Sequence, residues 1–516
     1  HAKGESIMKL TWKTVQRWVK LTFFAIFIIH AFPFMLGYEQ EWMRYAMPIF
    51  FFILLCLMFM PNPFGLSPYK ARAITWSAYL VAVGFMLLQP YAGGAPFRLT
   101  DSDCIMLILA NVSLTGSIIY LLTIGHPLRR LALLPFLVAL FMAAHTANSW
   151  PALLIHTSWL PWLYLPAYQE YLLIIIPGTV AGEWIAQWLE KMKANDTSEG
   201  LVESFQKRNE AVLENGNKVK NDEKVVLENE NKVRTRSEEM KEKENALALP
   251  VALLSLALIV VNVVLLFGRH LVANLVATMV LTALTAWLLR SRREAGTTGV
   301  EAAKQRSASK DASSQNAAKQ EVSNREASSQ EAAKQEVSSR EASSQEASKQ
   351  EVYNREASLQ EAAQQEVYNQ KCSSIPASPT LHFWQRLSSA GAYLLLLGLC
   401  LESYEGGIRK DDVTLSYLFV TCGLAFYALL LLTVVCDHWH VRWLCAPLEM
   451  VGKNPMVAYV SASMVIIPVL ILTQLYPYID ALSSQPLTGF LKGVLLTTLC
   501  MALTAWFTHK RWFWKT

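Results

Sequence analysis

The stretch "LPVALLSLALIVVNVVLLF", residues 249–267, decides the fold class of this chain. None of its residues is charged, and about 20 consecutive apolar residues are enough for a helix to cross the hydrocarbon core of a bilayer. The run is continuously apolar and does not alternate between apolar and polar residues, which excludes a transmembrane β-strand. The stretch is therefore predicted to be a membrane-spanning helix.

About twelve runs of this kind occur along the 516 residues, of which 53% are hydrophobic. They cover residues 19–36, 45–60, 72–90, 104–122, 129–146, 167–189, 249–267, 271–290, 386–404, 414–436, 447–475 and 489–507. The sequence thus predicts an all-α fold, a polytopic transmembrane helix bundle with about 12 spans.

Lys and Arg are concentrated in every second loop between these runs. They include Lys9, Lys13, Arg17 and Lys20, then Lys70, Arg72, Arg129, Arg130, Lys191, Lys193, Arg290, Arg442, Lys510 and Arg511. Basic loops stay on the cytoplasmic side of a membrane, so we expect these loops and both termini in the cytoplasm. The net charge of +5 is small for this length and gives no reason to expect nucleic acid as a partner.

Two charged segments divide the chain into five parts. We expect transmembrane helices 1–6 in residues 1–190, a charged cytoplasmic insertion in 191–248, helices 7–8 in 249–290, a repetitive tether in 291–380, and helices 9–12 in 381–516. The tether repeats a fifteen-residue unit such as "EAAKQEVSSREASSQ". Each unit offers few apolar residues, which favours a solvated, partly helical or disordered tether over the alternative, a coiled-coil site for a partner.

The eight cysteines include no CxxC pair and fall in predicted spans or cytoplasmic loops. We therefore expect them to be small packing residues, with neither a disulfide framework nor a metal site. The sequence also contains no Walker A loop, GxGxxG fingerprint or HExxH motif, which argues against ATP-driven transport and zinc hydrolysis.

The stretch "ESYEGGIRKDD", residues 402–412, carries six ionised side chains between two apolar runs, on the predicted external side. One interpretation is a hydrated turn, in which the two glycines supply a tight bend and the exposed ion pairs contribute little. The other is that Glu402, Glu405 and the charges that follow line the outer mouth of a polar cavity for a hydrophilic substrate.

The stretch "EMVGKNPMVAYV", residues 449–460, begins the eleventh predicted span on the cytoplasmic side. Asn454 before Pro455 is typical of a helix N-cap followed by proline at the first helical position. Lys453 adds a charge beside the free N–H groups of the helix start, a combination that could bind phosphate. An ordinary cap with an interfacial lysine is the alternative interpretation.

Further polar side chains lie in or near the spans. Glu183 follows Pro177 and Gly178 in a span, where a carboxylate is a candidate functional group, with snorkelling to the inner interface as the alternative. His30, His145 and His156 are each better explained as hydrogen-bonded structural residues than as a general base. His438 and His440, together with Arg442, favour anions or lipid headgroups over a metal.

Four stretches together resemble a known family. "SDCIMLILANVSLTGSIIYLL" (102–122), "YLLIIIPGTVAGE" (171–183), "EGGIRKDDVTLSYLFVTCGLAFY" (405–427) and "GKNPMVAYV" (452–460) resemble a bacterial family of uncharacterised membrane proteins related to heparan-alpha-glucosaminide N-acetyltransferase. The resemblance covers residues 1 to about 190 and 380 to the end. It implies a multi-pass protein of the bacterial inner membrane.

The resemblance also implies an activity, the transfer of acetyl from cytoplasmic acetyl-CoA to a sugar amine or hydroxyl on the external face. No tightly bound cofactor is expected, because acetyl-CoA is a co-substrate. The residues expected on the acetyl-CoA side are Lys453, Asn454, Arg130 and Arg442. Those expected on the acceptor side are Glu405, Arg409 and Asp411.

The family's N-terminal region carries an Asp-x-x-Arg-Gly pattern and an outer loop with the catalytic His, and this sequence contains neither. The chain begins "HAKGESI", which resembles the segment that follows that region. We therefore expect a truncated chain with the catalytic His lying upstream of it, and the resemblance leaves open whether this chain alone is active.

Two other classes of function remain as alternatives. A transporter or flippase for a glycan or lipid-linked sugar would use the same kinked helices and polar path, but predicts inverted repeats, which the spans do not display. A non-catalytic membrane scaffold would display the repetitive tether. Membrane lipids and an external glycan or amino sugar are the expected partners, and the sequence leaves a homodimer open.

Overall fold

The computed structural model describes residues 7–36, 41–60, 62, 65–89, 97–99, 104–144, 146, 149–213, 222–290, 378–410 and 413–514. Every regular element in these ranges is a helix, and no strand occurs among them. Ten helices in the described residues are long and apolar enough to cross a membrane. The prediction of an all-α, multi-pass membrane protein is confirmed.

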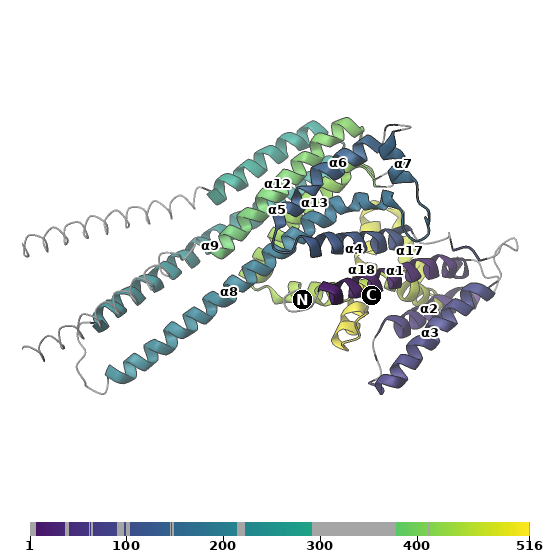
Figure 1. Cartoon of the computed structure of the whole chain (residues 1–516), viewed down its shortest axis with the longest axis horizontal. Coiled ribbons are helices and arrows are strands. Elements are labelled where there is room, and N and C mark those ends of the chain that lie inside the picture. The colour runs from purple at the N-terminus through teal and green to yellow at the C-terminus, as the bar shows by residue number, and fades with distance from the viewer. Residues whose placement is uncertain are drawn as a thin grey trace, which may run out of the picture. The chain divides into compact units, whose positions relative to one another are not determined.

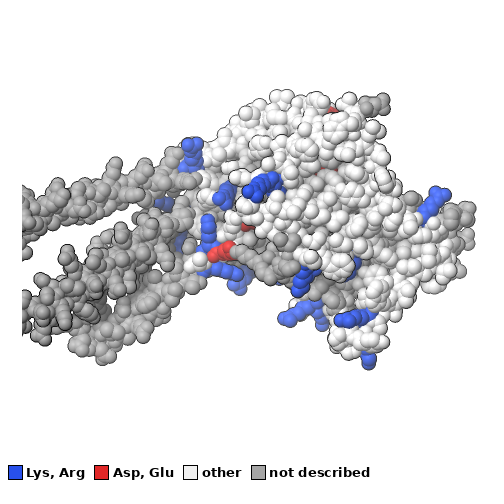
Figure 2. Space-filling view, viewed as in Figure 1, with Lys and Arg blue, Asp and Glu red and all other residues white. Residues whose placement is uncertain are grey.

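The ten helices correspond to ten of the twelve runs predicted from the sequence. The other two runs lie in α1 (Ile7–Leu36) and α2 (Glu41–Phe59), of which α2 contributes a shorter apolar helix, Tyr45–Phe59. On the face of the molecule shown in Figure 2, uncharged residues cover most of the described surface and Lys and Arg occur in small groups. Such a surface suits lipid, which cannot solvate charge.

The chain divides into two compact units, of which the first contains residues 1–183, 400–422 and 432–516. Besides α1 and α2, its helices are α3 (Pro68–Leu88), α4 (Cys104–Leu122), α5 (Pro127–Leu131), α6 (Leu133–Ala144), α7 (Trp150–His156) and η2 (Pro166–Tyr171). After residue 432 follow η3 (Thr433–His438), α14 (Arg442–Gly452), α15 (Pro455–Ser461), η4 (Ala462–Ile466), α16 (Ile467–Leu472), α17 (Tyr476–Ala481), η5 (Leu482–Ser484) and α18 (Pro486–His509).

Aromatic side chains form the centre of the first unit. Phe24 of α1 packs edge-on against Phe59 of α2, with ring centroids 5.7 Å apart. Trp514, beyond the end of α18, stacks on Phe59 at 5.9 Å. Figure 1 shows α1 beside α4, with which it makes its most extensive contact. These aromatic contacts join the N-terminal helices to the last residues of the chain.

The eleventh predicted span, residues 447–475, is wrong in its first part. The amphipathic helix α14 ends at Gly452, and the spanning helix begins only at Pro455 and runs to Leu472. Asn454 occupies the N-cap position as expected, but its side chain makes no capping hydrogen bond. Hydropathy predicts a single span here because Leu448, Met450 and Val451 are apolar and extend the apolar run toward the N-terminus.

The second unit contains residues 184–399 and 423–431. It includes most of α8 (Leu172–Leu213), α9 (Asp222–Phe267), the helix Leu271–Arg290, most of α12 (Pro379–Glu405) and part of α13 (Leu415–Leu432). Asn262 of α9 donates from Nδ2 to Thr278 Oγ1 at 3.0 Å, and both side chains are fully buried. This polar contact holds α9 against the helix that follows it, where apolar packing alone gives little specificity.

The first insertion, residues 191–248, continues the helices on either side of it. Figure 1 shows α8 and α9 each as an unbroken helix, extending to residue 213 and starting at residue 222. Lys, Glu and Gln favour helix, and the spanning parts of α8 and α9 supply the nucleus. Residues 291–377, which hold most of the tether, lie outside the described residues, and the division into five parts stays a prediction.

The expectation that the cysteines form no disulfide is wrong for one pair. Cys436 of η3 and Cys445 of α14 are bonded to each other, with their Cα atoms 5.7 Å apart. The spacing of nine residues is not a recognised motif, so only the local fold at the end of α13 reveals the pairing.

The helices α12 and α13 approach each other closely at Gly423. A Cβ atom added to this glycine would lie 2.6 Å from the backbone nitrogen of Leu395 and 2.8 Å from its Cα atom. Such a contact cannot be relieved by turning a side chain, because the obstructing atoms belong to the backbone. Gly423 therefore sets the distance between these two helices.

We expect Gly423→Ala to destabilise the protein by about 1–3 kcal/mol, because the methyl group forces α12 and α13 apart. Thermal unfolding in detergent would measure this as a lower Tm. Gly489→Ala in α18 is the matched control, since nothing lies within 4 Å of its added Cβ, and it should leave the Tm equal or slightly higher. Equal Tm values for the two variants would contradict the close packing.

Candidate functional site

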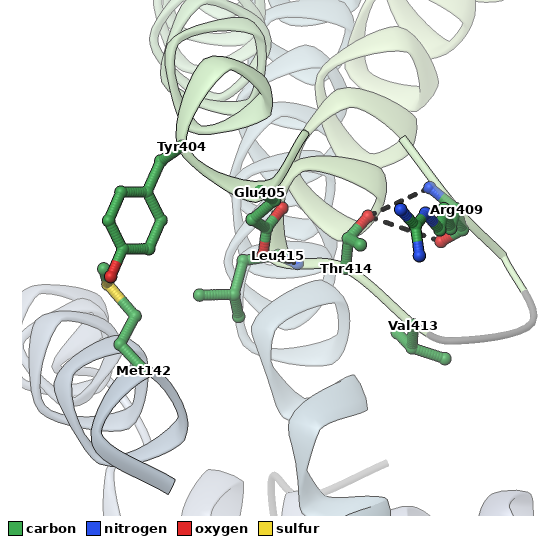
Figure 3. Close-up of a pocket in the computed structure, with 7 residues that line it drawn as sticks. All are labelled: Met142, Tyr404, Glu405, Arg409, Val413, Thr414 and Leu415. Carbon is green, nitrogen blue, oxygen red and sulfur yellow. Dashed lines mark hydrogen bonds between the residues drawn. The ribbon is translucent and has the colours of Figure 1, made fainter. Parts of the chain in front are cut away.

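A pocket of about 420 Å³ lies where the end of α12 meets the start of α13. Figure 3 shows Tyr404 on one side, directed toward Met142 of α6, with Glu405 and Leu415 in the middle and Thr414 and Arg409 on the other side. Val413 completes the lining. The structure thus brings together two predicted acceptor-side residues, Glu405 and Arg409.

Glu405 holds the first turn of α13. Its Oε1 accepts a hydrogen bond from the backbone N–H of Leu415 and its Oε2 one from that of Ser416, both at 2.8 Å. The first N–H groups of a helix have no partner within the helix, and a carboxylate also interacts favourably with the positive end of the helix dipole. Glu405 therefore caps α13 from the end of the preceding helix.

The loop between the two helices is also held by Thr414. Its Oγ1 accepts hydrogen bonds from the backbone N–H of Arg409 at 3.1 Å and of Tyr417 at 3.3 Å. Gly406 and Gly407 have φ values of 69° and 143°, which other residues rarely adopt. The glycines therefore make the bend that the sequence predicts, and the loop presents the Arg409 side chain at the pocket.

One of the other residues that were expected at this mouth is placed elsewhere, and one is not described. Glu402 is buried in α12 with 7% of its surface exposed, and the pocket lining does not include it. Asp411 lies outside the described residues. Tyr404, 76% exposed, and Met142 were not singled out from the sequence. Tyr404 stands inside the charged stretch already considered, whereas nothing in the sequence around Met142 indicates a site.

The pocket combines an exposed aromatic ring, a guanidinium group and a carboxylate. An aromatic face packs against apolar surface and keeps a polar hydroxyl at its edge, and Arg offers five donors. Both oxygens of Glu405 already accept an amide N–H of α13, so the carboxylate is held in one position at the pocket. The arrangement is suited to binding a polar molecule.

The residues expected at the acetyl-CoA side differ in how freely they can reach a ligand. Lys453 is exposed and its Nζ lies 2.5 Å from Glu449 Oε1, an exposed pair that contributes little to stability. Arg442 is exposed at the first position of α14. Both are available to an anion, and both lie in the segment that the sequence assigns to the cytoplasmic side.

Asn454 is committed to the fold. It is 1% exposed, its Nδ2 donates to the carbonyl oxygen of Trp512 at 2.7 Å, and its Oδ1 accepts from the N–H of Trp514 at 3.3 Å. The side-chain amide thus binds the backbone of the C-terminal segment and holds Trp514 against Phe59. No part of it is directed to a ligand in this conformation.

Arg130 is likewise buried. Its Nη2 donates to Glu183 Oε1 at 3.0 Å and to the carbonyl oxygen of Thr123 at 3.2 Å, while Nη1 donates to Thr179 Oγ1 at 3.1 Å. The guanidinium carbon also lies 4.6 Å from the ring centroid of Tyr120. Arg130 and Glu183, predicted separately as an anion-binding and a functional or snorkelling residue, are partners in one ion pair.

The histidines are placed as follows. His30 is buried in α1, where its Nδ1 lies 2.7 Å from the carbonyl oxygen of Ile26. His156 is exposed at the end of α7, and His145 lies outside the described residues. His440 is exposed, with Nδ1 3.0 Å from the carbonyl oxygen of His438. No group of three or more His, Cys, Asp or Glu that could hold a metal occurs in the described part of the chain.

Comparison with known proteins adds one match. Residues 1–185 match a family model described as a domain of unknown function, DUF5009. No curated protein and no solved structure matches the chain. The matched range contains Arg130 and Glu183 together with Met142 of the pocket, whereas the loop 404–415 lies beyond it. The chain is therefore a polytopic membrane protein with a domain similar to this uncharacterised family.

We expect Glu405→Ala to lower the free energy of unfolding by about 1–2 kcal/mol, because it removes both capping acceptors of α13. Glu405→Gln keeps one side-chain oxygen and should lose about half as much. Glu449→Ala is the control, an exposed glutamate whose loss should leave the Tm unchanged. Thermal unfolding of the three variants tests the cap, and equal Tm values for Glu405→Ala and Glu449→Ala would exclude it.

Removing either partner of the buried ion pair should be costly. Arg130→Ala leaves the Glu183 carboxylate without its cation, and we expect a loss of about 3–5 kcal/mol. Replacing both, as Arg130→Met with Glu183→Leu, removes the buried charge altogether and should restore much of the stability. Thermal unfolding of Arg130→Met, of Glu183→Leu and of the double variant forms a double-mutant cycle. If the losses in the two single variants add up to the loss in the double variant, the two groups are not coupled.

Proposed function

We propose that this protein is a membrane acetyltransferase, which moves an acetyl group from cytoplasmic acetyl-CoA to a sugar amine or hydroxyl on the external face. The observation that carries the proposal is the pocket at the α12–α13 loop, which brings Tyr404, Glu405 and Arg409 together on the predicted external side. The reaction is the one implied by the family that the sequence resembles. The cytoplasmic and external sides follow from the predicted order of the spans.

The acceptor side of the proposal follows from the pocket. A sugar ring has apolar faces edged by hydroxyl groups, so it can lie against the Tyr404 ring while the hydroxyl groups meet Arg409. The charged carboxylate of Glu405 favours an acceptor that carries an ammonium group, as an amino sugar does at neutral pH. Glu405 binds and orients this acceptor, and its fixed position as a helix cap keeps the charge in place.

The donor side of the proposal uses the exposed cations. Acetyl-CoA carries several phosphate charges, which Arg442 and Lys453 can meet without disturbing the fold. Arg130 and Asn454 are left out of this assignment, because both are buried and hydrogen-bonded within the protein. The acid–base group of the transfer is not assigned to any residue of the pocket.

The proposal is tested by calorimetry on the full chain in detergent, with acetyl-CoA and a glucosamine oligosaccharide as separate titrants. We expect Arg442→Ala and Lys453→Ala each to weaken acetyl-CoA binding about tenfold, as for the loss of a charged contact. Tyr404→Ala and Arg409→Ala should weaken only oligosaccharide binding. Lys492→Ala, at a cation on the predicted external side that does not line the pocket, is the control for both titrations.

The outcomes separate the proposal from its alternative. Absence of acetyl-CoA binding in a chain whose unfolding remains cooperative would overturn the acetyltransferase. Oligosaccharide binding without acetyl-CoA binding, with uptake of the oligosaccharide into proteoliposomes, would indicate the transporter or flippase. Binding of both ligands to their separate sites would support the acetyltransferase.

A further inference from the structure

The disulfide between Cys436 and Cys445 closes a short loop at the end of α13. The two residues are nine positions apart and their Cα atoms lie 5.7 Å from each other, well inside the range that a disulfide requires. Both cysteines are half-buried and neither belongs to the buried core. The loop between them carries His438, His440 and Arg442.

The backbone of this loop departs from regular helix at two places. Residues Thr433–His438 form a π-helical segment, a form that is rare and is frequently found at functional sites. His440 has a φ of 55°, in the left-handed region that few non-glycine residues adopt. Unfavourable backbone conformations of this kind persist where the surroundings enforce them, and they cluster in segments that change state. A covalent link across the loop is one such constraint.

The predicted topology puts this loop in the cytoplasm. Arg442 follows the tenth span, in a loop that the positive-inside rule assigns to the cytoplasmic side. Thiols in that compartment are kept reduced, and the disulfides that do form there are transient, catalytic or redox-sensing. A cysteine pair that is near enough to bond, only half-buried and on the predicted reducing side is therefore not expected to be a permanent bridge.

We propose that Cys436 and Cys445 form a reversible redox site, a dithiol in reducing conditions and a disulfide when the cytoplasm becomes oxidising. The proposal rests on the predicted topology and is independent of the acetyltransferase. Its oxidant is a low-molecular-weight disulfide, with oxidised glutathione as the test reagent. The disulfide joins the end of α13 to α14, and its reduction frees the segment that positions Arg442.

The exchange occurs in two steps. The thiolate of one cysteine attacks a sulfur of oxidised glutathione, forming a mixed disulfide and releasing one glutathione thiolate. The thiolate of the second cysteine then attacks the protein sulfur of the mixed disulfide, forming the Cys436–Cys445 bond and releasing the second glutathione thiolate. The protein loses two electrons, oxidised glutathione gains them, and the two thiol protons end on the released glutathione.

The test uses the full chain, reduced and then equilibrated with mixtures of reduced and oxidised glutathione. After acid quenching, free thiols are alkylated, and the mass of the peptide that contains both cysteines is measured by mass spectrometry. We expect conversion from a doubly alkylated peptide to one lighter than the dithiol by two hydrogens, and full reversal in excess reduced glutathione. Cys436→Ser and Cys445→Ser should each abolish the internal bond, whereas Cys400→Ser, at an exposed cysteine outside the loop, should leave it unchanged.

A second measurement follows the loop itself. The N–H groups of Trp439 and Val441 donate to Val434 and Val435 across the loop. We expect them to exchange with deuterium on the order of tenfold faster in the reduced protein, because the opened loop fluctuates more. Equal exchange in the two states would show that the bond constrains nothing.

The redox state of Cys436 and Cys445 in living cells distinguishes a reversible pair from a permanent disulfide. Acid-trapped membranes should contain the dithiol in untreated cells and the disulfide after treatment with diamide, a thiol oxidant. A bridge that is already complete in untreated cells and resists reduced glutathione would overturn the proposal and indicate a permanent bond on an oxidising side of the membrane. A pair that no ratio of oxidised to reduced glutathione converts would overturn it as well.

Discussion

The absence of water from the hydrocarbon core of a bilayer constrains the membrane-spanning part of this fold. A backbone N–H or C=O group in lipid must find its hydrogen bond within the protein, which continuous helices achieve along their length but not at their ends. Polar side chains supply partners at the start of α13 and add contacts just beyond the ends of α18 and α4. Glu405 accepts hydrogen bonds from the first N–H groups of α13. Asn454 donates to the carbonyl oxygen of Trp512, beyond the end of α18, and Arg130 donates to that of Thr123, directly after α4.

This constraint changes how the conspicuous polar residues are understood. A carboxylate, an amide or a guanidinium group between apolar runs is an obvious candidate for binding a ligand, yet each also fits an incomplete helix end. Burial separates the two cases, because Arg130 and Asn454 have almost no exposed surface whereas Lys453 and Arg442 are open to solvent. Glu405 belongs to both classes, since the hydrogen bonds that cap α13 also fix its charge at the edge of a pocket.

The sequence predicts the fold well because apolar length and loop charge are properties of each segment by itself. It fails where a property depends on contacts between segments. The break between α14 and α15 is hidden by apolar residues that pack beside α18, and the bond between Cys436 and Cys445 depends on how α13 ends. For the candidate site, Glu405 and Arg409 stand out by charge, whereas Met142 reaches the pocket only through the packing of α6. The pairing of Arg130 with Glu183 was hidden for the same reason, since 53 positions separate them.

The unbroken course of α8 has a mechanical consequence. A helix that continues without a break from the membrane into solvent transmits a change of tilt along its length. A small change of tilt in the membrane therefore causes a larger displacement of the far end of the helix. The part of α8 beyond residue 190 is roughly 35 Å long, and a tilt of about 10° would displace its tip by about 6 Å. Small movements among the spans would in this way become larger movements at the far end of α8.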